Sequence, residues 1–172
     1  LGIHLSRQTV RNILVDNGLE PEPPSALPES WDSFLARHAA TLWQCDFVSK
    51  PMWTTRGFVD LYVLVFLHIG TRRCWISPCT PHPTSAWVAQ AGREFLGVAE
   101  DMGLTPTMVM RDNAGEYTPA FDNVIRSAGA EIKRNTPWSP NLRAHVERFI
   151  QTFKRECLDH FLVIAPKQMN LI

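Results

Sequence analysis

The order of apolar patterns along the chain constrains its fold more than any other feature. Three consecutive runs rich in β-branched and aromatic residues, separated by glycine, proline and charge, predict strands over residues 42–50, 58–70 and 73–79. The spacing after them predicts a helix, a strand, a helix, a strand and a helix over 84–102, 107–111, 119–129, 131–135 and about 142–161. This alternation predicts an α/β domain whose sheet begins with antiparallel neighbours and ends with parallel ones.

The residues before the first predicted strand have a different organisation. Ser6 can cap a short amphipathic helix that Gly18 can end. Three apolar side chains of this helix are expected to face inward: Val10, Ile13 and Leu14. Four prolines between residues 21 and 28 rule out a helix or a strand there, so this segment is interpreted as a linker. A second short helix is predicted at "WDSFLARHAAT".

Length and composition agree with one globular domain. The 172 residues are 45% hydrophobic and 20% charged, which is typical of a protein with an ordinary core. A formal net charge of zero excludes a chain coated in basic residues. The charge is nevertheless uneven, because residues 126–155 hold seven basic residues and two acidic ones. This segment is the candidate face for a polyanion.

The cysteines and the apolar runs bear on the compartment. The four cysteines form no CxxC pair and no spacing typical of zinc ligands, so reduced thiols in the core are expected. The longest apolar run, "FVDLYVLVFLHIG", is too short to span a bilayer and contains Asp60. No leader with a charged start and an apolar centre opens the chain. A cytoplasmic protein without a membrane partner is therefore expected. The chain is also interpreted as a fragment, because it starts at Leu1 without a methionine.

Two aspartates lie in or directly after apolar strands. In "TMVMRDNAGEY", Asp112 follows a predicted core strand, and ligand sites in α/β sheets lie beyond the carboxyl ends of the strands. In "LWQCDFVSK", Asp46 lies within the strand itself, where an unpaired carboxylate is costly to bury. Taken alone, an aspartate such as Asp112 is more often a turn residue than a ligand.

A third carboxylate comes from the last predicted helix. Glu147 lies at the edge of the apolar stripe that this helix is expected to turn inward. The stripe consists of Val146, Phe149, Ile150, Phe153, Cys157 and Phe161. A single glutamate there is more often a solvated surface residue. Three carboxylates close together would raise one another's pKa unless a divalent cation neutralised them. Oxygen ligands without histidine or cysteine favour magnesium or manganese.

Three motifs carry a resemblance to a known family. They are "WQCDF" around Asp46, "MRDNAGEYTPAF" around Asp112 and "SPNLRAHVERFIQTFKRECLDHF" around Glu147. Together they resemble the Asp, Asp, Glu catalytic core shared by retroviral integrases and many bacterial insertion-sequence transposases. The resemblance covers roughly residues 41–164, and the third motif is the most specific. It implies a ribonuclease-H-like fold, with a mixed five-stranded sheet flanked by helices, that cuts and joins DNA with two bound divalent ions.

The resemblance also implies an organisation and partners. Residues 1–20 look like part of a helix-turn-helix, residues 21–40 are a linker and short helix, residues 41–164 are the catalytic core, and residues 165–172 are a truncated C-terminal segment. The implied partners are transposon ends and target DNA, on which such transposases generally assemble as homo-oligomers.

The expected roles of the site residues follow from two-metal chemistry. Two Mg²⁺ or Mn²⁺ ions about 4 Å apart can activate the attacking oxygen and stabilise the leaving one. Asp46 is expected to bridge both ions, with Asp112 on one and Glu147 on the other. Lys154 lies two turns after Glu147 on the same helical face, with Gln151 between them. The residues expected to contact DNA are Arg143, His145, Gln151, Lys154 and Arg155.

The chain departs from the family pattern at two points. Asp112 and Glu147 are separated by 34 residues, one fewer than is usual in this group, and Arg143 stands where an asparagine is common. Two alternatives to a transposase therefore stay open. One is a ribonuclease-H-like nuclease that cuts without joining, and the other is a catalytically silent DNA-binding remnant.

Five residues also have ordinary structural interpretations. Trp138, between prolines, is expected to pack on the domain rather than to stack on a base. His68, at the end of an apolar run, is expected to be structural, and Glu116 and Asp122 are expected to be surface residues. His145 is interpreted either as a neighbour of a phosphate or as a residue at the capped end of the helix.

Overall fold

The computed structural model describes residues 6–18, 31–134 and 144–172. The chain divides into two compact units, residues 1–34 and 35–172, and each is described by itself. The linker predicted over residues 21–28 lies outside the described residues. A second helix, α2 (Trp31–His38), spans the boundary between the units and was predicted from the sequence.

The first unit contains α1 (Arg7–Asp16), as the sequence predicts. The Ser6 hydroxyl caps this helix by accepting a hydrogen bond of 3.1 Å from the Thr9 N–H. Gly18 adopts the left-handed conformation just after the helix, with φ at 72°. Within this unit taken by itself, the three apolar side chains expected to face inward are 42, 47 and 37% exposed in turn: Val10, Ile13 and Leu14.

The second unit is built on a mixed five-stranded sheet in the order β3-β2-β1-β4-β5. The strands are β1 (Leu42–Thr54), β2 (Gly57–His68), β3 (Cys74–Ile76), β4 (Met108–Arg111) and β5 (Glu131–Arg134). β2 pairs antiparallel with both β3 and β1, whereas β4 pairs parallel with both β1 and β5. The predicted change from antiparallel to parallel neighbours is confirmed.

The hairpin of β1 and β2 extends beyond the predicted runs. Its register pairs Asp46 with Val65 and continues to Thr54 opposite Gly57. Gly57 has a φ of 117°, which a side chain would oppose, and its carbonyl accepts a hydrogen bond of 2.7 Å from the Thr54 hydroxyl. This turn fixes the register, and with it the side of the sheet to which each residue of β1 points.

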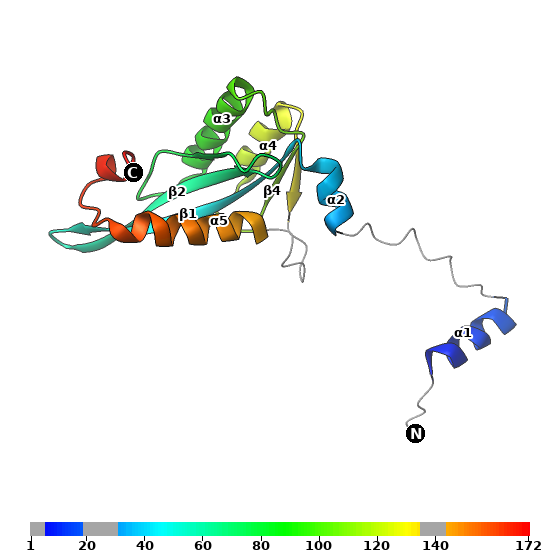
Figure 1. Cartoon of the computed structure of the whole chain (residues 1–172). Helices are drawn as coiled ribbons and strands as arrows, with labels where there is room; N and C mark the ends of the chain where they lie inside the picture. Colours follow the sequence, from blue (N-terminus) through cyan, green and yellow to red (C-terminus); the bar gives the residue numbers. More distant parts are fainter. Residues whose placement is uncertain (1–5, 19–30, 135–143) are drawn as a thin grey trace. The chain divides into compact units, whose positions relative to one another are not determined.

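Helices cover both faces of the sheet (Figure 1). On one face lie α3 (Ser85–Asp101) and α4 (Pro119–Ser127), and on the other lies α5 (Ala144–Glu156). The first face buries an aromatic cluster that includes Trp43, Phe66, Phe95 and Phe121. The face under α5 is mainly aliphatic. Both predicted helices on the first face are confirmed.

The last long helix ends earlier than the sequence suggests. It stops at Glu156, and the backbone of Cys157, with φ −129° and ψ −73°, leaves the helical region before a short 3₁₀ turn, η2 (Leu158–His160). Phe161 is 43% exposed, so its place in the predicted inward stripe is wrong. Leu158, which is fully buried, packs with the core under α5.

The segment after this turn packs on the same core. It contains the short helix α6 (Pro166–Met169), and Met169 is buried with the residues under α5. The side-chain oxygen of Asn170 accepts a hydrogen bond of 2.7 Å from the Cys79 N–H. Residues 165–172, expected to be a truncated end, therefore contribute to the core.

Three simpler expectations can also be compared with the structure. The four cysteines are free, as predicted. His68 is buried, and its Nε2 donates to the Ala40 carbonyl at 2.9 Å while its Nδ1 accepts from the Thr71 N–H at 3.0 Å, which confirms a structural role. Within the described residues, no helix has the length and apolar character needed to cross a membrane.

Candidate functional site

Asp46 and Asp112 belong to neighbouring parallel strands. The register of β1 and β4 pairs Gln44 with Met110. Two residues further along the parallel strands, Asp46 and Asp112 therefore stand at the same level. The carboxyl end of β4 coincides with this level, since the strand ends at Arg111. This is the edge at which ligand sites of such sheets lie.

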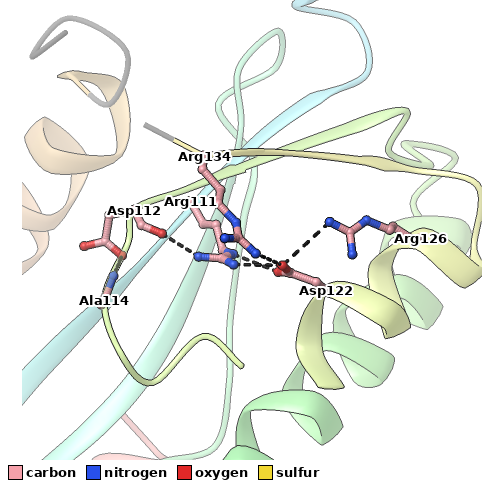
Figure 2. Close-up of polar contacts among 6 residues, drawn as sticks. All are labelled: Arg111, Asp112, Ala114, Asp122, Arg126 and Arg134. Carbon is pink, nitrogen blue, oxygen red and sulfur yellow. Dashed lines mark hydrogen bonds and ion pairs between the residues drawn. The ribbon is translucent and has the colours of Figure 1, made fainter. Parts of the chain in front are cut away.

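Each aspartate is oriented by backbone close to it in the sequence. Asp46 is half-buried, and its Oδ1 accepts a hydrogen bond of 2.9 Å from the Phe47 N–H. Asp112 is also half-buried, and its Oδ1 accepts a hydrogen bond of 3.1 Å from the Ala114 N–H. The second bond forms a local turn directly after the strand (Figure 2).

The pKa values of two buried side chains, Cys45 and Tyr117, depend on the charges of both aspartates. The pKa of the Cys45 thiol is raised to about 12, mainly by burial, with smaller increases from the charges of Asp46 and Asp112 included. Burial also raises the pKa of Tyr117, with further increases from Cys45 and from the same two aspartates. The Tyr117 hydroxyl lies near the Cys45 thiol but has no hydrogen-bonding geometry to any described residue. These shared effects indicate that both carboxylates lie near one region of the core.

Gln44 ties the start of α5 to the strand that carries Asp46. Its fully buried side-chain oxygen accepts a hydrogen bond of 3.1 Å from the Val146 N–H. Gln44 and Asp46 are two residues apart on a strand, so both point to the face that α5 covers. Glu147 follows Val146 directly, in the exposed first turn of the helix. The third candidate carboxylate thus begins next to the strand of the first.

The three candidate ligands do not form a closed metal site. Within residues 6–18, 31–134 and 144–172, no three His, Cys, Asp or Glu side chains lie close enough together to hold a metal ion. Carboxylates repel one another when no cation lies between them. Their oxygens nevertheless match the ligands that Mg²⁺ and Mn²⁺ prefer. The assignment of Asp46, Asp112 and Glu147 as metal ligands therefore stays a prediction.

A buried ion-pair cluster stands directly behind Asp112 (Figure 2). Arg111, 2% exposed, forms two hydrogen bonds to the Asp122 carboxylate, from Nε at 2.8 Å and from a terminal nitrogen at 2.9 Å. Arg134 donates to the same carboxylate at 2.7 Å, and Arg126 lies 3.7 Å from it. The interpretation of Asp122 as a surface residue is wrong, since this side chain is 1% exposed.

This cluster holds the backbone of Asp112. The second terminal nitrogen of Arg111 donates a hydrogen bond of 2.7 Å to the Asp112 carbonyl, and the guanidinium lies 5.1 Å from the centre of the Tyr117 ring. Burial alone would raise the pKa of Asp122, but the hydrogen bonds and charges of Arg111 and Arg134 outweigh burial and lower it. Asp122 therefore keeps a charge that fixes Arg111, and Arg111 fixes the position of Asp112.

Sequence reasoning missed Arg111 and Asp122, although a weak signal exists. Arg111 ends a strand whose residues are otherwise apolar. Asp122 lies directly after Phe121 and three residues before Ile125, both fully buried on α4. A charged residue on such an inward stripe needs a buried partner of opposite charge.

The residues predicted to contact DNA lie along α5. Gln151 and Arg155 are exposed, and Lys154 is half-buried. His145 is half-buried as well, and its pKa is lowered first by burial and then by the positive charges of Arg72 and Arg148. Two other residues named in the sequence analysis lie outside the described residues: Trp138 and Arg143.

Comparisons with known proteins agree with this fold. No protein-family model and no curated protein sequence matches the chain. The HTLV-2 integrase catalytic core domain in complex with magnesium, in its trimeric form, matches with a TM-score of 0.54 and 16% identity over 75% of this chain and 78% of its own. The dimeric form of that domain matches with a TM-score of 0.50 and 18% identity over 67% of this chain and 68% of its own.

A larger assembly contains the same fold. A chain of the simian T-cell lymphotropic virus intasome, in complex with PP2A regulatory subunit B56 gamma, matches with a TM-score of 0.53 and 18% identity. The match covers 67% of this chain and only 38% of the intasome chain. This chain has the ribonuclease-H-like fold of integrase catalytic cores. The predicted fold class is confirmed.

Proposed function

We propose that this chain is the catalytic core of a transposase, an integrase-type enzyme that cuts DNA strands and joins them to a target. The observation that carries the proposal is the common level of Asp46 and Asp112 on adjacent parallel strands. The buried bond between Gln44 and the Val146 N–H supports it, because the helix that bears Glu147 starts against the same strand. The integrase fold and the magnesium in two of the similar structures are further support.

In this proposal, Asp46, Asp112 and Glu147 would together hold two Mg²⁺ or Mn²⁺ ions. The ions would supply activation of the attacking oxygen and stabilisation of the leaving oxygen at a phosphodiester. Arg111 keeps Asp112 in place through its backbone carbonyl, and Gln44 keeps the first turn of α5 against β1. Both act as positioning residues, because neither touches the reacting atoms.

DNA would lie along the exposed side of α5. Gln151, Lys154 and Arg155 follow Glu147 on this helix and can donate hydrogen bonds to phosphate oxygens. We further propose that residues 1–20 belong to a DNA-recognition module, that residues 41–164 form the catalytic core, and that the protein assembles as a homo-oligomer on transposon ends and target DNA.

The proposal is tested with labelled DNA ends bearing a free 3′-hydroxyl, in buffer with manganese. The wild-type chain is expected to produce cut and joined products. Asp46→Asn, Asp112→Asn and Glu147→Gln are each expected to abolish both reactions while DNA binding is retained, since each removes one ligand charge. Two matched controls at exposed positions, Asp101→Asn on α3 and Glu156→Gln at the end of α5, are expected to keep both reactions.

The outcomes separate the alternatives. Cutting without joining would indicate a nuclease. DNA binding with neither reaction, unchanged by Asp112→Asn, would indicate a silent remnant. Saturable thermal stabilisation by manganese that Asp46→Asn removes would support the metal assignment independently of activity.

A further inference from the structure

A cleft of about 330 Å³ lies beside the first two turns of α5. Its walls come from this helix and from the end of β2 with the turn that follows it. The lining residues are Leu67, Arg72, His145, Arg148, Phe149 and Thr152. Arg72 and Arg148 give the cleft two positive charges, and none of its lining residues is acidic.

The turn after β2 holds Arg72 in an unusual backbone conformation. Its φ of 63° is in the left-handed region, which residues with a Cβ rarely adopt. The Arg72 N–H donates to the His68 carbonyl at 3.0 Å, and His68 is itself fixed by the Ala40 carbonyl and Thr71. The arginine therefore projects from a tightly determined turn rather than from a loose loop. Residues in such strained conformations cluster at functional sites.

Three residues of α5 complete the polar wall of the cleft. His145, Arg148 and Thr152 are three and four residues apart, so they share one face of the helix. Arg72 and Arg148 both line this cleft, one from the turn after β2 and the other from α5. Among the described residues, neither arginine forms an ion pair with a carboxylate. Two neighbouring cations without an anion attract one from outside.

We infer that this cleft binds one phosphate group of the DNA backbone, held by Arg72 and Arg148 from opposite walls. The inference rests on the proposed function, since it concerns the same DNA. Arginine matches phosphate geometry through its fork of N–H donors, and the Thr152 hydroxyl is a third donor. Leu67 and Phe149 offer an apolar wall to the adjoining sugar.

The test measures affinity for a labelled duplex by fluorescence anisotropy, with a chelator present so that binding does not depend on metal or on chemistry. The variants are Arg72→Gly, Arg148→Gln and the double variant. The control is Arg93→Gln, which removes the same charge from the exposed side of α3, where Arg93 donates a hydrogen bond of 3.3 Å to Gln90. Each single variant is expected to weaken binding about tenfold at low salt, and the control less than twofold.

The salt dependence reports how many phosphates are held. If both arginines hold one phosphate, the double variant lowers the slope of log affinity against log salt by about 0.9 relative to the wild-type chain. A decrease of about 1.8 would mean that two phosphates are bound separately, and would overturn the single-phosphate site. The double variant should also lose less binding free energy than the sum of the losses in the two single variants, because both arginines act on one phosphate.

Folding defects are separable from lost contacts at residue 72. Glycine adopts a φ of 63° without strain, so Arg72→Gly is expected to unfold at the same temperature as the wild-type chain or higher. If both cleft variants bind DNA as tightly as Arg93→Gln while the wild-type chain binds, the inference is wrong and the proposed function is untouched. If the wild-type chain binds no DNA, the proposed function fails together with the inference.

Discussion

Asp112 and Glu147 are both candidate metal ligands, but the protein holds the backbone around them by different means. Asp112 follows a fully buried strand, and behind it Arg111 is locked to a buried carboxylate by two short hydrogen bonds. Glu147 lies in the exposed first turn of α5, where the Val146 N–H donates a buried hydrogen bond to Gln44. One side of the candidate site is braced by a charged network, and the backbone of the other is held by a neutral hydrogen bond.

The difference has a physical consequence. An ion pair buried in the core loses several kcal/mol when one partner is removed, because the remaining charge stays desolvated. A neutral hydrogen bond loses roughly 1–3 kcal/mol when its partner is removed from a buried group. The Asp112 side is therefore expected to be rigid, and the Glu147 side to adjust more readily when a ligand binds.

The largest effect is expected from Arg111→Met. It should lower the free energy of unfolding by about 3–5 kcal/mol, because Asp122 remains buried without its main partner. Denaturant unfolding measures this change. Arg126→Gln is the matched control, since Arg126 is half exposed and lies 3.7 Å from the same carboxylate, and it should cost about 0.5 kcal/mol or less. Equal losses in the two variants would show that the network does not depend on Arg111.

A smaller effect is expected from Gln44→Met. This change keeps the side-chain volume but leaves the buried Val146 N–H without its acceptor, so it should cost about 1–3 kcal/mol. Amide hydrogen exchange should speed up most at the start of α5. Gln90→Met, on the exposed side of α3, should stay within about 0.5 kcal/mol of the wild-type chain. Unchanged exchange at Val146 would mean that packing alone holds the helix start.

The smallest effect concerns Arg134→Gln and depends on pH. The pKa of Asp122 is lowered in the folded protein, so its stabilisation is complete above the ordinary aspartate pKa of about 3.9 and is lost as pH falls through the lowered value. Arg134 is half exposed, so its removal should cost at most about 1 kcal/mol at neutral pH. This cost should shrink towards zero in acid, once Asp122 is protonated in both proteins.

The free energy of unfolding, measured at neutral and acidic pH, tests whether the cost of Arg134→Gln shrinks as the pH falls. Arg93→Gln serves as the control without a carboxylate partner, and its effect should be small at both pH values. If the cost of Arg134→Gln grew as pH fell, Arg134 would not act through the Asp122 charge.

Much of the fold was predictable because local pattern and tertiary packing agree. The apolar spacing over residues 84–102 predicts α3, and the runs of β-branched and aromatic residues predict the central hairpin. The end of α5 was not predictable in this way. Phe161 continues the spacing of the inward stripe, yet the backbone turns at Cys157 and Leu158 enters the core instead.

By itself, the sequence determined the order of the elements and the mixed sheet, and it singled out three acidic positions as candidates, because side-chain periodicity and strand-end chemistry are local properties. Only the tertiary structure decided that Asp122 is buried on Arg111, that Gln44 holds the start of α5, and that Arg72 and Arg148 line one cleft. Each of these pairs joins different elements of the fold. Such contacts depend on how strands and helices pack together, which no local pattern contains.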